Sequence, residues 1–180
     1  MSRQDQTIQA SPEPTSASAF LADPLEFARE GRSLAGSVAV IQLERLHDLL
    51  ADTSGAIAWS VRGGVEDDGA GERKFLWLEA EAELRLVCQR CLGPYAFPLR
   101  LSSCLELMAP GQPLPDEELE DDRCDAIEVD RNLDLLALVE DEILLALPQS
   151  PRHKVCSPLG EMDGSSEKVS PFAALAALKK

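Results

Sequence analysis

The sequence predicts an α+β domain, an antiparallel sheet flanked by a few helices, in a chain of 180 residues. Several segments alternate apolar and polar residues with the period of two that is typical of half-buried strands. One segment in the last third of the chain instead repeats leucine-type residues with helical spacing. At this length a single domain with one core is expected.

The charge and the cysteines restrict the possible partners. The net charge is −15, from 32 acidic and 17 basic residues, so any contact with RNA phosphates must be local. No apolar run reaches the ~20 residues of a membrane helix, and the first residues lack the apolar core of a signal peptide. We therefore expect a cytoplasmic protein that does not bind membranes. The five cysteines then favour reduced thiols or a metal site over a disulfide framework.

The first part of the chain predicts a tail, a short helix and two strands. Residues 1–22 are rich in Ser, Gln, Pro, Thr and Ala and are expected to be disordered, so that the domain covers residues 23–180. Asp23 and Pro24 predict the start of a short helix that ends at Gly31. Residues 37–43 indicate a strand, residues 43–50 have helical spacing, and residues 57–61 alternate as a second strand.

The middle of the chain predicts a long hairpin. The glycine-rich, acidic residues 63–72 are interpreted as a mobile loop between antiparallel strands. From Ala80 to Cys88 the apolar residues share one face of a strand, and residues 95–108 are extended again. The pair Cys88 and Cys91, followed by Gly93 and Pro94, is then expected at the tip of the hairpin.

The last part predicts one secure helix. Residues 110–125 indicate a second mobile acidic loop, and residues 126–129 indicate a brief edge strand. Asp134 can cap a helix whose apolar stripe continues until Pro148 stops it. Residues 171–178 predict a short terminal helix.

Three segments in this order resemble the YceD family of large ribosomal RNA subunit accumulation proteins. They are Leu86-Val87-Cys88-Gln89-Arg90-Cys91, the segment from Asp134 to Pro148 (DLLALVEDEILLALP), and the terminus from Pro171 to Lys180 (PFAALAALKK). The resemblance implies a cytoplasmic role in the synthesis, processing or stability of large-subunit (23S) ribosomal RNA. It implies no known catalytic reaction and no particular mechanism.

The cysteine pair has the spacing of a zinc knuckle, which needs two further nitrogen or sulfur ligands. His153 and Cys156 could supply them if the segment after Pro148 returns to the hairpin tip, so zinc is the candidate cofactor. The alternative is a set of reduced thiols beside a surface histidine. Cys104 and Cys124 receive no role.

A thioredoxin-like redox enzyme is the catalytic alternative for the pair. That chemistry needs a helix N-terminus beside the thiol, whereas this pair joins two predicted strands. We therefore expect no enzyme and no small-molecule substrate.

Basic and aromatic residues suggest a local binding surface. Arg85, Arg90 and Arg100 are expected around the hairpin tip, with Arg152 and Lys154 joining them if the later segment folds back. Such a basic surface could bind RNA phosphates or an acidic part of a partner. Alternatively, the arginines pair across strands with Glu83 and Glu106. Trp59, Trp77 and Tyr95 could stack on bases, although burial is expected for the tryptophans.

The acidic run Glu140, Asp141 and Glu142 usually indicates the solvated face of an amphipathic helix. Functionally it could bind a basic ribosomal protein or an assembly factor.

The sequence as a whole leaves two functional hypotheses. One is a non-catalytic ribosome-biogenesis factor that contacts ribosomal RNA. The other is a zinc-knuckle adaptor that binds a basic protein and affects the RNA indirectly. The salt dependence of RNA binding would separate them.

Overall fold

The computed structural model describes residues 20–67, 71–112 and 123–158. The predicted tail over residues 1–19, most of the second predicted loop (residues 113–122) and the predicted helix over residues 171–178 lie outside these ranges. The elements in chain order are β1 (Phe20–Leu21), α1 (Pro24–Arg29), β2 (Ser33–Ala39), η1 (Val40–Gln42), η2 (Glu44–Leu49), β3 (Leu50–Asp52), β4 (Ala56–Asp67), β5 (Glu72–Val87), β6 (Pro94–Met108), β7 (Asp125–Glu128), β8 (Leu133–Asp134) and α2 (Leu135–Ala146).

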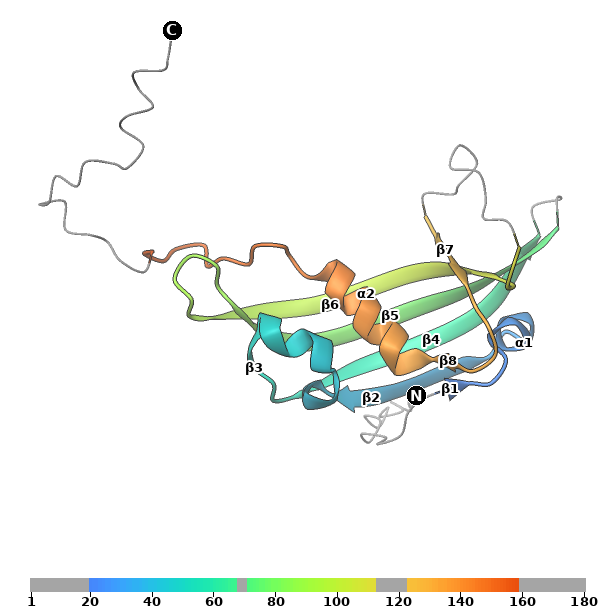
Figure 1. The fold of residues 1–180 in the computed structure, drawn as a ribbon, viewed down its shortest axis with the longest axis horizontal. Coiled ribbons are helices and arrows are strands. Elements are labelled where there is room, and N and C mark those ends of the chain that lie inside the picture. Colours follow the sequence, from blue (N-terminus) through green and yellow to red (C-terminus); the bar gives the residue numbers. More distant parts are fainter. Residues whose placement is uncertain (1–19, 68–70, 113–122, 159–180) are drawn as a thin grey trace, which may run out of the picture.

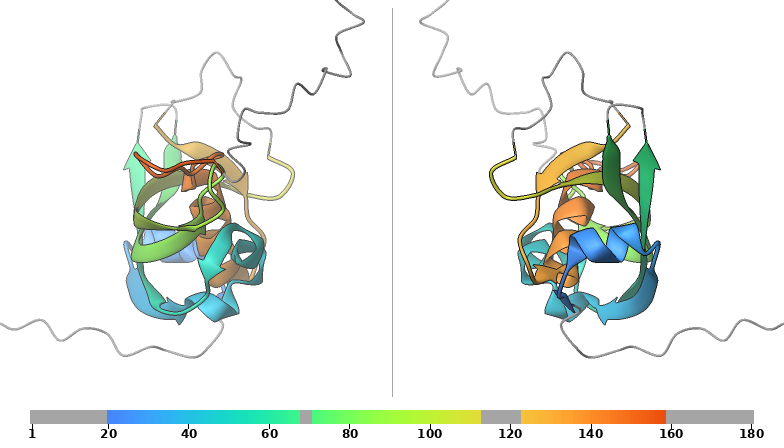
Figure 2. Two further views of the ribbon diagram at one scale, coloured as in Figure 1. Left: turned by 90° about the vertical axis from the view of Figure 1, so that its left-hand side faces the viewer. Right: turned by 90° about the vertical axis from the view of Figure 1, so that its right-hand side faces the viewer.

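One curved sheet forms the body of the protein (Figure 1). Its strand order is β2-β4-β5-β6-β7, and β3 pairs with β5 beside this path. All pairs are antiparallel except β6 with β7, which is parallel. Seen end-on, the sheet curves around α1 and α2, which lie on its concave side (Figure 2). The predicted α+β class is confirmed.

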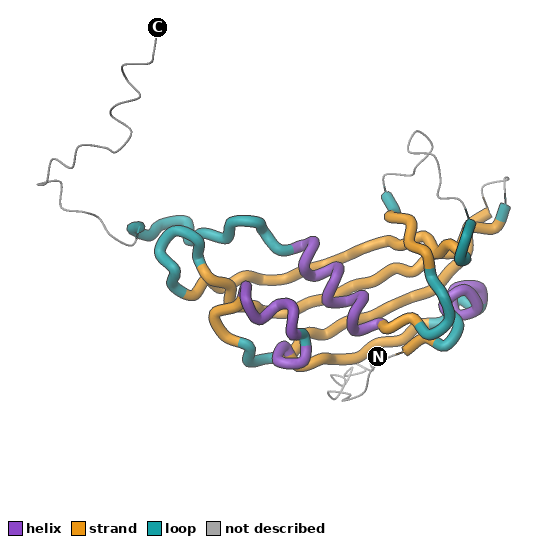
Figure 3. The backbone as a smooth tube through the Cα atoms, in the orientation of Figure 1, coloured by secondary structure: helices purple, strands orange, loops and turns teal. Residues whose placement is uncertain are grey.

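The core lies between the concave face and the helices. Alternate residues of β4, β5 and β6 point into it, as the register Trp59 opposite Ala80 and Val61 opposite Leu78 shows. Helix α2, which crosses the strands in Figure 3, contributes Leu135, Val139 and Ile143, each fully buried. The predicted helical stripe and the predicted alternation are both confirmed.

Local sequence sets the ends of both helices. The side chain of Asp23 accepts a hydrogen bond from the backbone N–H of Glu26, and Pro24 occupies the first turn. The side chain of Asp134 accepts from Leu136 and Ala137 at the start of α2. Both predicted caps are therefore confirmed.

The first predicted loop is wrong over residues 63–67 and 72, because β4 continues to Asp67 and β5 begins at Glu72. Gly63 and Gly64 serve close packing instead of a turn. A Cβ at Gly63 would lie 2.7 Å from the Cα of Ala28 in α1, and one at Gly64 would lie 2.6 Å from the Trp77 ring. Glycine in a strand permits such close approach.

Other boundaries also differ. Phe20 and Leu21, assigned to the tail, form β1, which pairs with β8. The strand expected over residues 37–43 runs from Ser33 to Ala39, and the helical spacing over residues 43–50 becomes the 3₁₀ helix η2. The expected edge strand is confirmed as β7. Within the described ranges, no helix is long and apolar enough to cross a membrane.

Cys104 and Cys124 form a disulfide that joins β6 to the residue before β7. The expectation of reduced thiols is wrong for this pair. A separation of 20 residues along the chain gave no signal of pairing. The parallel β7 brings the two residues together, and this pairing is not evident from the local sequence.

Candidate metal centre at the hairpin tip

The β5–β6 hairpin ends in a tight turn that presents two cysteines. The backbone N–H of Cys88 donates to the carbonyl of Gly93 at 2.9 Å, and that of Leu92 donates to Cys88 at 2.8 Å. Leu92 adopts a left-handed conformation with φ 56°. Cys88 is buried and Cys91 is half-buried. The predicted hairpin with the pair at its tip is confirmed.

The segment after α2 returns to this tip, as the left end of Figure 1 shows. The backbone N–H of Gln89 donates to the carbonyl of Pro151 at 2.8 Å. The guanidinium of Arg90 donates to the carbonyl of His153 at 3.1 Å and to the Cys156 sulfur at 2.9 Å. These contacts bring the predicted third and fourth ligands to the cysteine pair.

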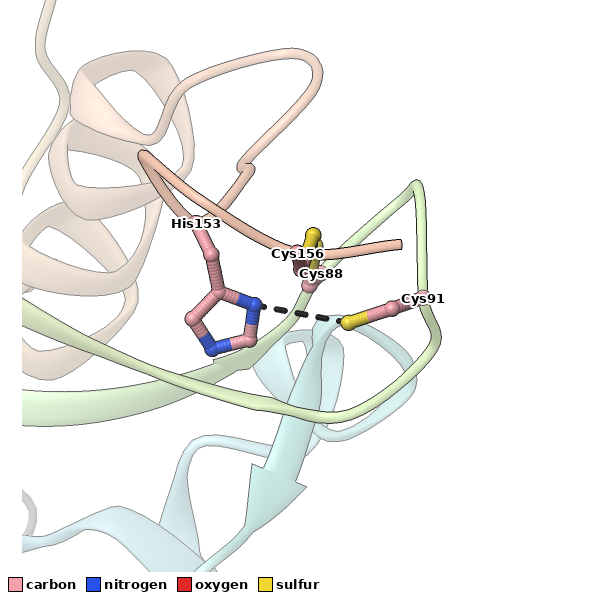
Figure 4. A group of neighbouring side chains, drawn as sticks. All are labelled: Cys88, Cys91, His153 and Cys156. Carbon is pink, nitrogen blue, oxygen red and sulfur yellow. Dashed lines mark hydrogen bonds between the residues drawn. The ribbon is translucent and has the colours of Figure 1, made fainter. Parts of the chain in front are cut away.

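The four candidate ligands form one compact group (Figure 4). Their ligand atoms all lie within 4.8 Å of one another. The sulfurs of Cys88 and Cys156 are 3.8 Å apart, and the Cys91 sulfur is 3.4 Å from His153 Nδ1. Zn–S bonds of about 2.3 Å in a tetrahedron give S···S edges of about 3.8 Å. The group therefore has the donor types and the size of a tetrahedral zinc site.

The ring of His153 is held in the orientation that a ligand needs. Its Nε2 lies 2.9 Å from the carbonyl oxygen of Pro94. A carbonyl can only accept, so Nε2 carries a proton, and in the neutral ring Nδ1 then keeps its lone pair toward Cys91. The ring of Tyr95 meets the imidazole edge-on, with ring centroids 5.5 Å apart. These contacts fix which nitrogen faces the thiols.

The thiols do not ionise alike. Burial raises the pKa of the Cys88 thiol. Hydrogen bonds from the backbone N–H groups of Cys91, Arg90 and His153 outweigh burial and lower the pKa of that thiol to about 5. The Cys88 thiol therefore ionises more readily than an ordinary cysteine thiol.

The neighbouring groups shift in the opposite direction. At Cys91 a backbone hydrogen bond from Gly93 lowers the pKa, but burial and the nearby sulfurs of Cys88 and Cys156 raise it more. The pKa of His153 is raised by hydrogen bonding to Cys156, then to Cys88. One thiolate thus hinders ionisation of the next, and a bound cation would relieve this repulsion.

The predicted basic residues are only partly brought together. Arg90 contacts Cys156 and His153 within the candidate site. Arg152 and Lys154 are exposed on the returning segment. Arg85 lies three residues before Cys88 on the exposed face of β5, opposite Ala96. Arg100 pairs in register with Glu81, about 20 Å along the strand from the tip. Arg100 is therefore not part of the tip.

Glu83 and Glu106 have other cross-strand neighbours than the arginines that were expected to pair with them. Glu106 is buried and accepts from Arg73 Nε at 2.8 Å, while Glu83 lies opposite Pro98. Trp59 is buried as expected, and Trp77 is half-buried beneath the guanidinium of Arg62 at 4.1 Å. Neither tryptophan lies at the hairpin tip.

The acidic run on α2 is not a solvated face. Glu140 and Glu142 are each 8% exposed. Glu140 accepts from the backbone N–H of Arg45 at 2.8 Å, and Glu142 accepts from the Ser103 hydroxyl at 2.6 Å. Asp141 is half exposed and pairs with the Arg45 guanidinium. Two of these carboxylates therefore serve the fold, which the charge pattern did not indicate.

Sequence reasoning missed the backbone groups that complete the site. The carbonyl oxygens of Pro94 and Pro151 orient His153 and anchor the returning segment. Any residue type offers such a carbonyl, so the sequence carries no signal for it. The placement of the cysteine pair between two strands, with no helix starting there, agrees with the argument against thioredoxin-like chemistry.

The fold and the site together define a class, that of α+β proteins with a candidate metal centre of three thiols and one imidazole. The chain matches the family model described as large ribosomal RNA subunit accumulation protein YceD over residues 76–179, more than half of its length. It therefore belongs to the YceD family. The match includes all four candidate ligands and begins within β5. No solved structure matches the chain.

Proposed function

We propose that this protein is a non-catalytic, cytoplasmic ribosome-biogenesis factor that supports the accumulation of 23S ribosomal RNA by binding it at a zinc-organised hairpin tip. The family description names accumulation of the large ribosomal RNA and no reaction. The observation that carries the proposal is the convergence of Cys88, Cys91, His153 and Cys156. This convergence joins two segments more than sixty residues apart in the chain into one surface.

Zinc suits this site in a structural role. Three sulfurs and one imidazole fill all four corners of a tetrahedron, so no corner is left for a substrate or a reactive water. Three thiolates with one zinc ion carry a net charge of −1, and the Arg90 guanidinium beside Cys156 offsets it. The ion would hold the returning segment against the hairpin.

The tip carries exposed cations that suit an RNA phosphate. Arg152 and Lys154 are exposed beside Arg90, while the whole chain carries a charge of −15. A few cations on an acidic body restrict contact with RNA to one place. The half-buried Tyr95 lies at the same end and packs against His153.

The salt dependence of RNA binding tests the proposal. The full chain is titrated with fragments of 23S ribosomal RNA, as wild type and as the double variant Arg152→Ala and Lys154→Ala. Loss of two phosphate contacts lowers the slope of log K against log salt by roughly 1.5. Arg100→Ala is the control, because it removes one positive charge away from the tip.

Two results would contradict direct RNA binding. One is an unchanged slope in the double variant, and the other is an equal loss in Arg100→Ala. If the double variant keeps its affinity for RNA but no longer binds a protein partner, the result would favour the adaptor that binds a basic protein.

A further inference from the structure

We propose that the outer edge of β2, which no described strand covers, binds an extended, basic segment of a partner protein, which adds to the sheet as an antiparallel strand. The proposal goes beyond RNA binding at the hairpin tip and does not depend on the metal centre. The two edge strands of the sheet, β7 and β2, differ in how well they are protected against pairing with a further strand.

The edge at β7 is short and charged. Its four residues include Asp125 and Glu128. The edge at β2 is a seven-residue strand, Ser33–Ala39, without a charge, a proline or a register shift. Among the described strands, β2 is hydrogen-bonded to β4 alone. Exposed edges normally carry charges, prolines or bulges that prevent further pairing, and β2 has none of them.

The register shows which backbone groups are free. Gly63 N–H donates to the carbonyl of Arg32, and Val40 N–H donates to the carbonyl of Gly55. In the alternation of an antiparallel ladder, residues 34, 36 and 38 then bond to β4. The N–H and C=O groups of the other strand residues point away from β4; these residues are Ser33, Ala35, Ser37 and Ala39.

The side chains beside this edge leave room for a strand. Ser33 and Ala35 are small and exposed, and they line a shallow hollow on the convex face with Ser60. On the opposite face Leu34 is 40% exposed, although its neighbour Val61 is buried. An added strand with an apolar residue beside Leu34 would cover this side chain.

A buried donor lies at the middle of the same edge. The Trp59 ring covers Gly36 so closely that a Cβ there would lie 2.8 Å from the ring. Within the described ranges the indole N–H of Trp59 has no hydrogen-bond partner, although the residue is only 6% exposed. Buried donors normally have acceptors. A polar side chain of an incoming strand could reach this position over Gly36.

Charge selects a basic partner over a second copy of this chain. Two copies would bring two charges of −15 together. The exposed carboxylates of Glu44 and Asp52 lie within a few residues of the end of β2 and the start of β4. An antiparallel strand would place its N-terminal lysines at this end of β2, where both carboxylates add to the attraction, although Asp52 lies beside β5, opposite Arg85.

The probe is a synthetic peptide of the β2 sequence preceded by lysines, titrated into the full-length protein and followed by amide chemical shifts. We expect saturable binding, with shifts at Ser33, Ala35 and Ser37 larger than at the intervening residues. A peptide with glutamates in place of the lysines binds at least about tenfold more weakly. A peptide methylated on alternate backbone nitrogens does not bind, and this test leaves the protein unchanged.

A matched pair of variants locates the site. Ala35→Pro removes an N–H that points away from β4, so the existing ladder keeps its bonds. This variant binds the peptide roughly tenfold more weakly, because one hydrogen bond and its neighbours are lost. Ser102→Lys, on the same convex face within the sheet, leaves the affinity unchanged.

Three results would overturn the proposal. The first is no binding of the lysine peptide, and the second is equal binding of the methylated peptide. The third is a dimer in sedimentation equilibrium that Ala35→Pro dissociates, since a second copy would then occupy the edge.

Discussion

The Glu140 carboxylate is expected to stabilise the fold by connecting α2 to η2. Its Oε1 accepts from the backbone N–H of Arg45 at 2.8 Å, and the side chain is 8% exposed. That N–H belongs to the first turn of η2 and has no partner within the helix. Glu140→Ala leaves it without an acceptor. Hydrogen bonds to charged groups contribute about 1.5–3 kcal/mol, so the free energy of unfolding should fall by about 2 kcal/mol.

Urea unfolding followed by circular dichroism measures this difference. The matched control is Asp141→Ala on the same turn, because an exposed ion pair contributes at most about 1 kcal/mol. Glu140→Gln keeps an acceptor oxygen and should lose less than the alanine variant. Equal, small losses in Glu140→Ala and Asp141→Ala would refute the structural role of Glu140 and favour the acidic helix as a binding face.

Three further predictions concern other parts of the fold. Opening the Cys104–Cys124 disulfide, which closes a loop of 20 residues, should lower the free energy of unfolding by about 3 kcal/mol; urea unfolding with and without a phosphine reductant measures this, and Cys104→Ser should not respond to the reductant. Gly63→Ala should cost about 1–3 kcal/mol in the same assay, because the new Cβ meets the backbone of α1, and a variant as stable as wild type would contradict the packing. In the metal-free protein, Cys88 has its pKa lowered from 9.0 to about 5, so its contribution to stability is present above pH 9 and lost as the pH falls through about 5. The stability difference between metal-free wild type and Cys88→Ser should therefore grow as the pH rises from 5 to 9, and a difference that shrinks would reverse the assigned sign.

The candidate metal centre was predictable because it depends on the spacing of nearby residues and on the kinds of ligand that a metal requires. The spacing of Cys88 and Cys91 between two alternating segments indicated a hairpin tip, and thiols require partners of specific types. His153 and Cys156 were the complement within reach of a chain that ends its helix at Pro148. The core face of α2 was predictable for a similar reason, since its apolar stripe and cap are local.

The remaining features depend on contacts between distant segments. Gly63 resembles a loop residue in sequence, and only the approach of α1 explains it as a strand residue. From the sequence, Glu140 and Glu142 are expected to be solvated. In the structure they accept hydrogen bonds from Arg45 of η2 and Ser103 of β6, which the local sequence does not indicate. The partner of Cys104 depended on the parallel strand β7. The distance of Arg100 from the tip depended on the hairpin register.

The metal content of the purified protein tests the central claim most directly. Zinc is measured in chelator-free protein, as wild type, Cys88→Ser and Cys156→Ser, with Cys104→Ser as a control outside the cluster. We predict one zinc ion per chain in the wild type and in Cys104→Ser, with loss in both cluster variants, which would link the hairpin to the segment after α2. Wild-type protein without zinc, or zinc retained in Cys156→Ser, would contradict a metal centre shared by the two segments.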